Sequence, residues 1–304
     1  MIILPREHRL IKKIVFRVVR SHIAGATMKT ALEEVSRLNG RKINATITFL
    51  NEHADDPLKA KYNSNTYIQI IKQISRLHLK ASVSVRLAQL GYSLDNGCMD
   101  RCLDAVLAAA RPYSTVVWLE PGEGVPYDSL AEVYMKRMSD YPNIGIELPI
   151  SHYGSIRKLL PELKSSSRVR IIRHPYMFAE EEKEKKAWKG HADGYINVIK
   201  LLSKKKTKIY VQESNDKIIS KIASSTKGNR GNLIFGLPLG YSGKRLNGML
   251  KSKMSVDIYV PYGKDWTPYA IYGLAGGKLR RIATALLDGK QKSEEEWQQK
   301  QEKR

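Results

Sequence analysis

The chain has 304 residues, with 52 Lys or Arg against 30 Asp or Glu, so its formal net charge is +22. Hydrophobic residues make up 42%, enough to build the core of one large domain or two small ones. A charge this positive indicates a polyanionic partner, although it also favours solubility. No apolar run approaches the roughly 20 residues of a membrane-spanning helix and no signal peptide is visible, so a soluble, cytoplasmic protein is predicted.

Residues 1–23 are predicted to form an amphipathic helix ahead of the main domain. Its basic residues recur at steps of three or four, which places on one face Arg6, Arg9, Lys13, Arg17 and Arg20. Such a face usually mixes acids with bases, and here only Glu7 does so. An anion-binding face and a solvated face of a packed helix both remain open. A membrane-surface helix ranks last, because the apolar side has Phe16 and no Trp.

From residue 24 to residue 287, short β-rich runs alternate with helical stretches. We predict eight strands, at 44–51, 80–87, 114–121, 144–150, 168–175, 208–214, 232–240 and 255–263. Eight strand–helix units in about 250 residues predict an α/β fold, a TIM-like (β/α)8 barrel, with a doubly wound open sheet as the alternative. Residues 288–304 form a charged tail, predicted as a surface helix or a disordered end.

The working residues of such a barrel lie at the C-terminal ends of the strands. Arg86, Glu120 and Arg170 fall there, and we expect them to form a buried ion network. A structural plug of the barrel mouth is favoured over a catalytic centre, because a fully paired carboxylate is a weak general base. No metal is expected, since no His, Asp and Glu residues recur at the spacing that is typical of metal ligands. Cys98 and Cys102 are predicted to be reduced thiols.

Five segments of the chain resemble the proline dehydrogenase family, in the order in which that family has them. They are LEEVSRLNGRKINATITFLNEHADD, VSVRLAQLG, YPNIGIELPI, RVRIIRHPY and YVPYGKDWTPY, which together span residues 24 to 280. Members of this family are PutA-like (β/α)8 barrels that bind FAD and oxidise proline to pyrroline-5-carboxylate. The resemblance therefore implies the same fold that the strand–helix alternation predicts.

The resemblance also implies roles for single residues. The family-equivalent catalytic positions are Arg86, where the family has Lys, Glu120, where it has Asp, and Tyr259, which lines the substrate pocket. Arg170 and Tyr176 match flavin-contacting residues, so they would bind the cofactor only if flavin is retained.

The substrate anchor of the family is missing. The family's helix after strand 8 carries two adjacent arginines that grip the proline carboxylate, and a Glu three residues later. This chain has Tyr272, Gly273 and Gly276 there, and Pro149 replaces a flavin-contacting Gln. Because bidentate arginines are the strong form of carboxylate recognition, their loss is expected to weaken proline binding by orders of magnitude.

These features predict a pseudoenzyme: a barrel that has lost turnover, needs no cofactor and binds structured RNA, with the ribosome as one candidate. The predicted RNA-binding residues are the Lys and Arg residues named above for the first helix, together with Lys204, Lys205, Lys206, Lys227, Arg230, Lys244 and Arg245. A membrane partner is not expected, and no oligomeric state is predicted. The alternative is an FAD-dependent proline dehydrogenase, or a related flavin oxidoreductase with an altered substrate, because Arg170, Tyr176 and Tyr259 persist.

Overall fold

The computed structural model describes residues 20–51, 53–94, 97–122, 124–173, 181–226 and 231–269. Most of the predicted first helix and the whole tail 288–304 lie outside these ranges. So do the predicted site residues Arg6, Arg9, Lys13, Arg17, Tyr176, Lys227 and Arg230, and the substituted anchor positions Tyr272, Gly273 and Gly276.

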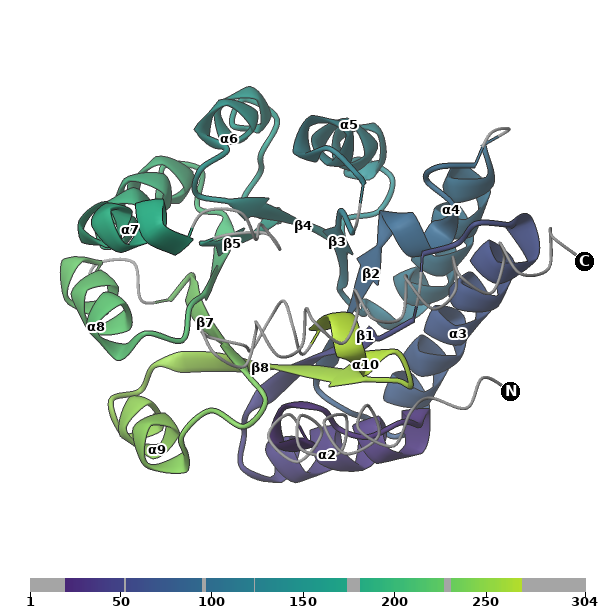
Figure 1. Ribbon diagram of the computed structural model, residues 1–304, viewed down its shortest axis with the longest axis horizontal. Helices are drawn as coiled ribbons and strands as arrows, with labels where there is room; N and C mark the ends of the chain where they lie inside the picture. Colours follow the sequence, from purple (N-terminus) through teal and green to yellow (C-terminus); the bar gives the residue numbers. More distant parts are fainter. Residues whose placement is uncertain are drawn as a thin grey trace, which may run out of the picture.

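Eight parallel strands close into a barrel in sequence order, so that β1 pairs with both β2 and β8 (Figure 1). The strands are β1 Asn44–Phe49, β2 Ala81–Arg86, β3 Val117–Glu120, β4 Ile144–Pro149, β5 Arg168–Ile172, β6 Lys208–Gln212, β7 Leu233–Pro238 and β8 Ser255–Tyr262. The predicted (β/α)8 barrel is thus confirmed and the open sheet is excluded. The third strand starts three residues later than predicted, because Arg111–Tyr113 form a 3₁₀ turn and Ser114 takes a left-handed conformation.

Helices surround the barrel, and each follows a strand except α2, which precedes β1 (Figure 1). They are α2 Met28–Gly40, α3 Pro57–Arg76, α4 Cys98–Ala110, α5 Tyr127–Arg137, α6 Tyr153–Leu159, α7 Glu181–Ser203, α8 Asp216–Ser225, α9 Gly243–Lys251 and α10 Trp266–Tyr269. Side-chain caps explain several starts: Thr27, Asp56 and Asn215 accept backbone N–H groups of the first turns of α2, α3 and α8. Cys98 and Cys102 both lie on α4 and are free thiols.

Side chains alternate along each strand between the helical shell and the barrel interior. On β4, Ile144, Ile146 and Leu148 join the hydrophobic core. The residues between them, Gly145 and Glu147, face the interior, where they meet Trp118 and Arg170 respectively. The outward residues therefore hold the barrel and the shell together, and the inward residues are free to carry polar chemistry.

Gly145 gives a test of how tightly the interior is packed. A Cβ atom at this position would lie 2.5 Å from Cε3 of Trp118. Gly145→Ala is therefore expected to lower the free energy of unfolding by about 1–3 kcal/mol, because the indole or the strand must shift. Gly248→Ala on α9 is the control, since nothing lies within 4 Å of its added Cβ and alanine is preferred in a helix. Urea unfolding, monitored by circular dichroism, measures the free energy of unfolding of both variants. An equal loss in the two would contradict the prediction.

Within the ranges that the structure describes, no helix is long and apolar enough to cross a membrane.

Candidate active site at the C-terminal mouth of the barrel

The barrel interior contains a buried arginine that is surrounded by acceptors. Arg170 of β5 is 2% exposed. Its Nη1 lies 3.2 Å from Glu120 Oε1, 3.4 Å from Glu147 Oε2 and 3.1 Å from Ser84 Oγ, and its Nη2 lies 3.3 Å from Thr46 Oγ1. These partners come from four different strands, so the guanidinium ties together β1, β2, β3 and β4 from the inside of the barrel.

Glu120 links this arginine to the mouth. It accepts hydrogen bonds from the Ser84 hydroxyl, from Tyr259 Oη at 3.0 Å and from Arg86 Nε at 3.4 Å. The ion network of Arg86, Glu120 and Arg170 expected from the strand ends is therefore present. The structure adds Tyr259 to it, so three of the family-equivalent positions and the predicted flavin-contacting arginine form one hydrogen-bonded cluster.

Aromatic rings enclose the Arg170 guanidinium. Its Cζ lies 4.4 Å from the centroid of the Trp118 ring and 5.8 Å from that of Tyr259. The Trp118 indole N–H donates to Ser82 Oγ at 3.2 Å, and the ring packs edge-on against Tyr210. Cation–π contacts of this kind stabilise a desolvated cation, which helps to explain how an arginine can be buried here.

Two further buried carboxyl groups have altered acidities. Burial and the neighbouring charge of Glu120 raise the pKa of Glu147 to about 8, and the attraction of Arg170 opposes this rise only in part. Burial raises the pKa of Asp257 to about 6, against the lowering effect of its hydrogen bond from Thr46 and of Arg170. At neutral pH the interior therefore holds the Arg170 cation beside a mostly protonated Glu147 and a mostly ionised Asp257.

A second pair of charged residues follows β5 and β6 at the same end of the barrel. Arg173 Nε lies 3.8 Å from Glu213 Oε2, and Glu213 Oε1 accepts the backbone N–H groups of Ser214 and Asn215 at 2.8 and 2.9 Å. The Arg173 side chain is 28% exposed and that of Arg86 is 15% exposed. Two guanidinium groups therefore remain accessible at the mouth, each held by a buried carboxylate, whereas Arg170 lies deeper.

The predicted nucleic-acid-binding residues that the structure describes lie at two opposite ends of the barrel. Lys244 and Arg245 begin α9 directly after β7, which places them at the mouth end. Arg20 lies at that end too, because the neighbouring Ser21 packs against Gly240 after β7. Lys204, Lys205 and Lys206 follow α7 and precede β6, so they lie at the other end. The basic residues of the sequence therefore do not form one surface.

Sequence reasoning missed the interior residues Glu147, Asp257 and Trp118. It considered only the ends of the strands, and these three lie within them. For Glu147 and Asp257 the available signal was the occurrence of a charged residue inside a strand that is otherwise apolar, as in IGIELPI and SVDIYV. A charge in the middle of a buried parallel strand must face either a partner or the lumen.

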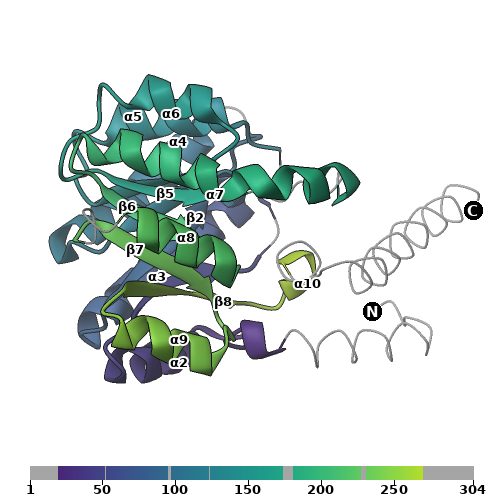
Figure 2. The same ribbon diagram turned by 90° about the vertical axis from the view of Figure 1, so that its left-hand side faces the viewer.

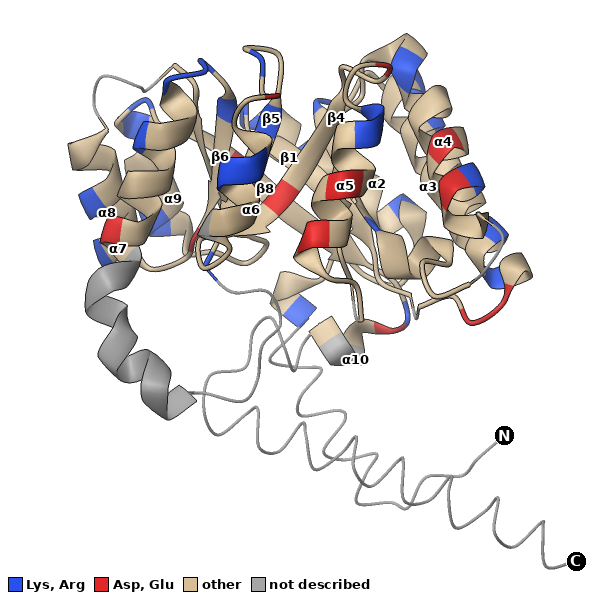
Figure 3. Ribbon diagram, turned by 90° about the horizontal axis from the view of Figure 1, so that it is seen from above, with Lys and Arg blue, Asp and Glu red and all other residues tan. Residues whose placement is uncertain are grey.

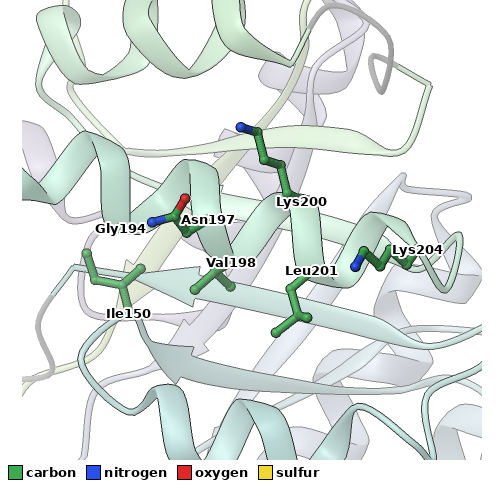
Figure 4. A pocket seen from close by; sticks show the side chains of 7 residues that line it. All are labelled: Ile150, Gly194, Asn197, Val198, Lys200, Leu201 and Lys204. Carbon is green, nitrogen blue, oxygen red and sulfur yellow. The ribbon is translucent and has the colours of Figure 1, made fainter.

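A separate hollow of about 470 Å³ runs along α7, outside the barrel (Figure 4). Ile150, Val198 and Leu201 form its apolar floor, with Lys200 and Lys204 beside it. It does not reach the interior cluster, and none of its described lining residues is a carboxylate or a nucleophile. We therefore place the candidate active site at the mouth. No group of three His, Cys, Asp or Glu residues within the described ranges could hold a metal ion.

No family model matches this chain. Its sequence is similar to curated proline dehydrogenases: it is 22% identical to Proline dehydrogenase 1 of Bacillus subtilis strain 168 over 267 residues, which cover 87% of this chain and 85% of the relative. It is likewise 22% identical to Proline dehydrogenase of Deinococcus radiodurans, with 94% of each chain covered.

Solved structures of proline utilization A (PutA) share the fold. The PutA of Bdellovibrio bacteriovorus, inactivated by N-propargylglycine, superposes with a TM-score of 0.74 at 16% identity and covers 90% of this chain. A PutA mutant of Bradyrhizobium japonicum gives a TM-score of 0.63 at 14% identity and covers 94%. This chain spans only about a third of those much longer proteins.

Fold and site together define a (β/α)8 barrel with an arginine–glutamate cluster beneath its C-terminal mouth. The predicted resemblance to the proline dehydrogenase family, with a PutA-like barrel, is confirmed.

Proposed function

We propose that this protein is a flavin-dependent oxidoreductase of the proline dehydrogenase type that acts on an amine other than proline. The observation that carries the proposal is the hydrogen-bonded cluster of Arg86, Glu120, Arg170 and Tyr259 at the mouth. The likeness to curated proline dehydrogenases over 87% to 94% of the chain supports it. This alternative has more support than the RNA-binding pseudoenzyme expected from the sequence.

The donors at the mouth fit a flavin dinucleotide. That cofactor offers anionic phosphates and a ring edge rich in acceptors, which require cations and N–H donors. Arg86 and Arg173 supply two partly exposed guanidiniums at the mouth. Arg170 fits less well as a direct contact, because Glu120, Glu147, Ser84 and Thr46 already surround it. In this proposal Arg86 and Arg173 hold the cofactor, and Arg170 positions Glu120.

When bound, the flavin supplies a two-electron acceptor for a hydride taken from the carbon next to the substrate nitrogen. The substrate also releases a proton from that nitrogen, and a C=N bond forms. Tyr259, held by Glu120, forms one wall of the substrate pocket. The protonated Glu147 limits the negative charge in the interior below it. Since Tyr272 and Gly273 stand where the family has its carboxylate-binding arginines, the proposed substrate is a secondary amine without that carboxylate.

Anaerobic titration tests this proposal. Purified protein supplemented with FAD is expected to bind about one flavin per chain, and pyrrolidine is expected to bleach the flavin absorbance faster than L-proline does. Arg86→Met should weaken FAD binding at least about tenfold, because the variant cannot make a charge-assisted hydrogen bond to the cofactor. Lys61→Gln, an exposed charge on α3, is the matched control and should bind FAD as the wild type does. Failure of the wild type to take up FAD would overturn the proposal.

A scaffold without turnover is the second candidate. The observation in its favour is that the interior arginine is fully engaged by the protein's own acceptors, as expected of a structural plug. In this reading the partner is structured RNA, with the ribosome as one possibility. A colourless protein that takes up no FAD, but sediments with ribosomes at low salt and not at high salt, would favour this candidate over the first.

A further inference from the structure

The two ends of the barrel differ in the residues that adopt left-handed backbone conformations. All glycines with positive φ in the described ranges lie at the mouth end, as Gly91, Gly122, Gly240 and Gly263 illustrate. The residues with positive φ that are not glycine lie at the other end, in turns that lead from a helix into the next strand. They are Lys42, His78, Ser114, Lys206 and Lys253.

These turns share one hydrogen-bond pattern. At Lys42 and Lys253, the N–H of the left-handed residue bonds to the carbonyl three residues back, and the next N–H bonds to the carbonyl five residues back. Lys206 makes the first of these bonds, to Ser203. This is the common end of an α-helix, and glycine is its usual left-handed residue, because a Cβ is disfavoured there. Lysine occupies the position in three turns, so an ammonium group is retained where glycine would suit the backbone better.

Other basic residues lie in the same set of turns, which we call the N-terminal rim. Arg41, Lys80, Arg111, Lys164, Lys204 and Lys205 add to the three left-handed lysines. Acidic residues of the described rim turns are Asp140 and Glu162. In Figure 3, blue segments recur along the edge that lies opposite α10, and Figure 2 shows α10 at the far end from the helix-to-strand turns.

The three left-handed lysines are spread around the rim. Lys253 precedes β8, Lys42 precedes the neighbouring β1, and Lys206 precedes β6 on another side of the barrel. Within the described ranges none of the three forms an ion pair, and Lys42, Lys206 and Lys253 are all exposed. Positive charge distributed in this way suits a long chain of phosphates better than a single small anion.

We propose that the N-terminal rim binds the phosphate backbone of structured RNA. A lipid surface fits less well, because the large exposed apolar residues of the rim in the described ranges, Leu77 and Tyr113, lie in one sector next to β2 and β3. Because this positive charge is spread over many turns, recognition is of backbone and shape. This site lies at the opposite end from the mouth, and the inference holds whether or not the protein binds a flavin.

The left-handed lysines allow a variant that removes charge without harming the fold. In the triple variant K42G/K206G/K253G, glycine replaces lysine at three positions where its backbone freedom is favourable. The control K61Q/K72Q/K217Q removes the same charge from exposed residues outside the rim turns. Thermal unfolding of the rim variant should occur at or above the wild-type temperature, so weaker RNA binding cannot be attributed to unfolding.

Fluorescence anisotropy with a 20-base-pair RNA duplex, across a series of salt concentrations, measures binding. The rim variant is expected to bind at least about tenfold more weakly near 0.1 M salt. The slope of log K against the logarithm of the salt concentration should be smaller in magnitude by about two to three, since the loss of each lysine leaves one phosphate fewer neutralised. The control should stay within about threefold of the wild type. Wild-type affinity in the rim variant, an equal reduction in the control, or binding only to phosphatidylglycerol vesicles would overturn the proposal.

Discussion

Arg170→Met is expected to lower the free energy of unfolding by about 3–5 kcal/mol at pH 8, because it leaves buried carboxyl groups without their shared cation. Glu120 and Glu147 each lie within 3.4 Å of the Arg170 guanidinium, and all three side chains are buried. Methionine restores much of the volume, so the loss reports mainly on charge. The effect should be smaller at pH 5, where the carboxyl groups can protonate. Urea unfolding at the two pH values measures it.

The matched control for this variant is Arg168→Met, two residues earlier on β5. Arg168 is partly exposed and donates to the backbone carbonyls of Pro142 and Ser166 rather than to a buried carboxylate. Its loss should cost no more than about 1 kcal/mol and should not depend on pH. A similar loss in both variants, or a loss at position 170 that does not vary with pH, would show that the interior network is not held by charge.

Glu147→Gln is expected to abolish a fall in stability that the wild type shows as pH rises. The pKa of this carboxyl group rises from 4.5 in the unfolded chain to about 8 in the folded protein. Between these values the folded state binds more protons than the unfolded state, so stability decreases with pH until the group is ionised in both states. The total effect is on the order of a few kcal/mol. The amide keeps the shape of the neutral acid, and the variant should therefore be more stable than the wild type at pH 8.5.

The window from pH 6.5 to 8.5 isolates this group from Asp257. The pKa of Asp257 is raised to about 6, so most of its own contribution lies below that window. Stability measured by urea unfolding should fall across the window in the wild type and stay level in Glu147→Gln. Glu162→Gln, an exposed residue between α6 and β5, should fall as the wild type does. A level wild-type profile would contradict the assignment.

The sequence predicted the barrel well because hydrophobic runs and turns are local signals. All eight strands were located, and Arg86 and Glu120 were found because a parallel barrel directs attention to the C-terminal ends of its strands. The opposite placement of Lys204 and Lys244 also follows from topology, since Lys204 follows a helix and Lys244 lies at the start of one.

The interior chemistry was harder to predict. Along a strand, every second side chain points to one side of the sheet and the others point to the opposite side. Which of these two sets faces the lumen is decided only when the sheet closes, and a single sequence does not show it. Glu147 and Asp257 were missed for this reason, and their raised pKa values come first from burial inside the closed barrel, which forms only when all the strands come together. The roles of Arg86, Glu120, Arg170 and Tyr259 in catalysis or flavin binding stay predictions.

The alternation along each strand has a consequence for how this protein can diverge. Residues such as Ile144, Ile146 and Leu148 anchor the architecture, while their neighbours Gly145 and Glu147 set the chemistry of the lumen. Each strand thus carries two alternating sets of residues, an outer set that packs against the helices and an inner set that faces the lumen. Mutation can change the inner set while the outer set preserves the scaffold, so a barrel of this kind can keep its architecture while the chemistry of its lumen changes.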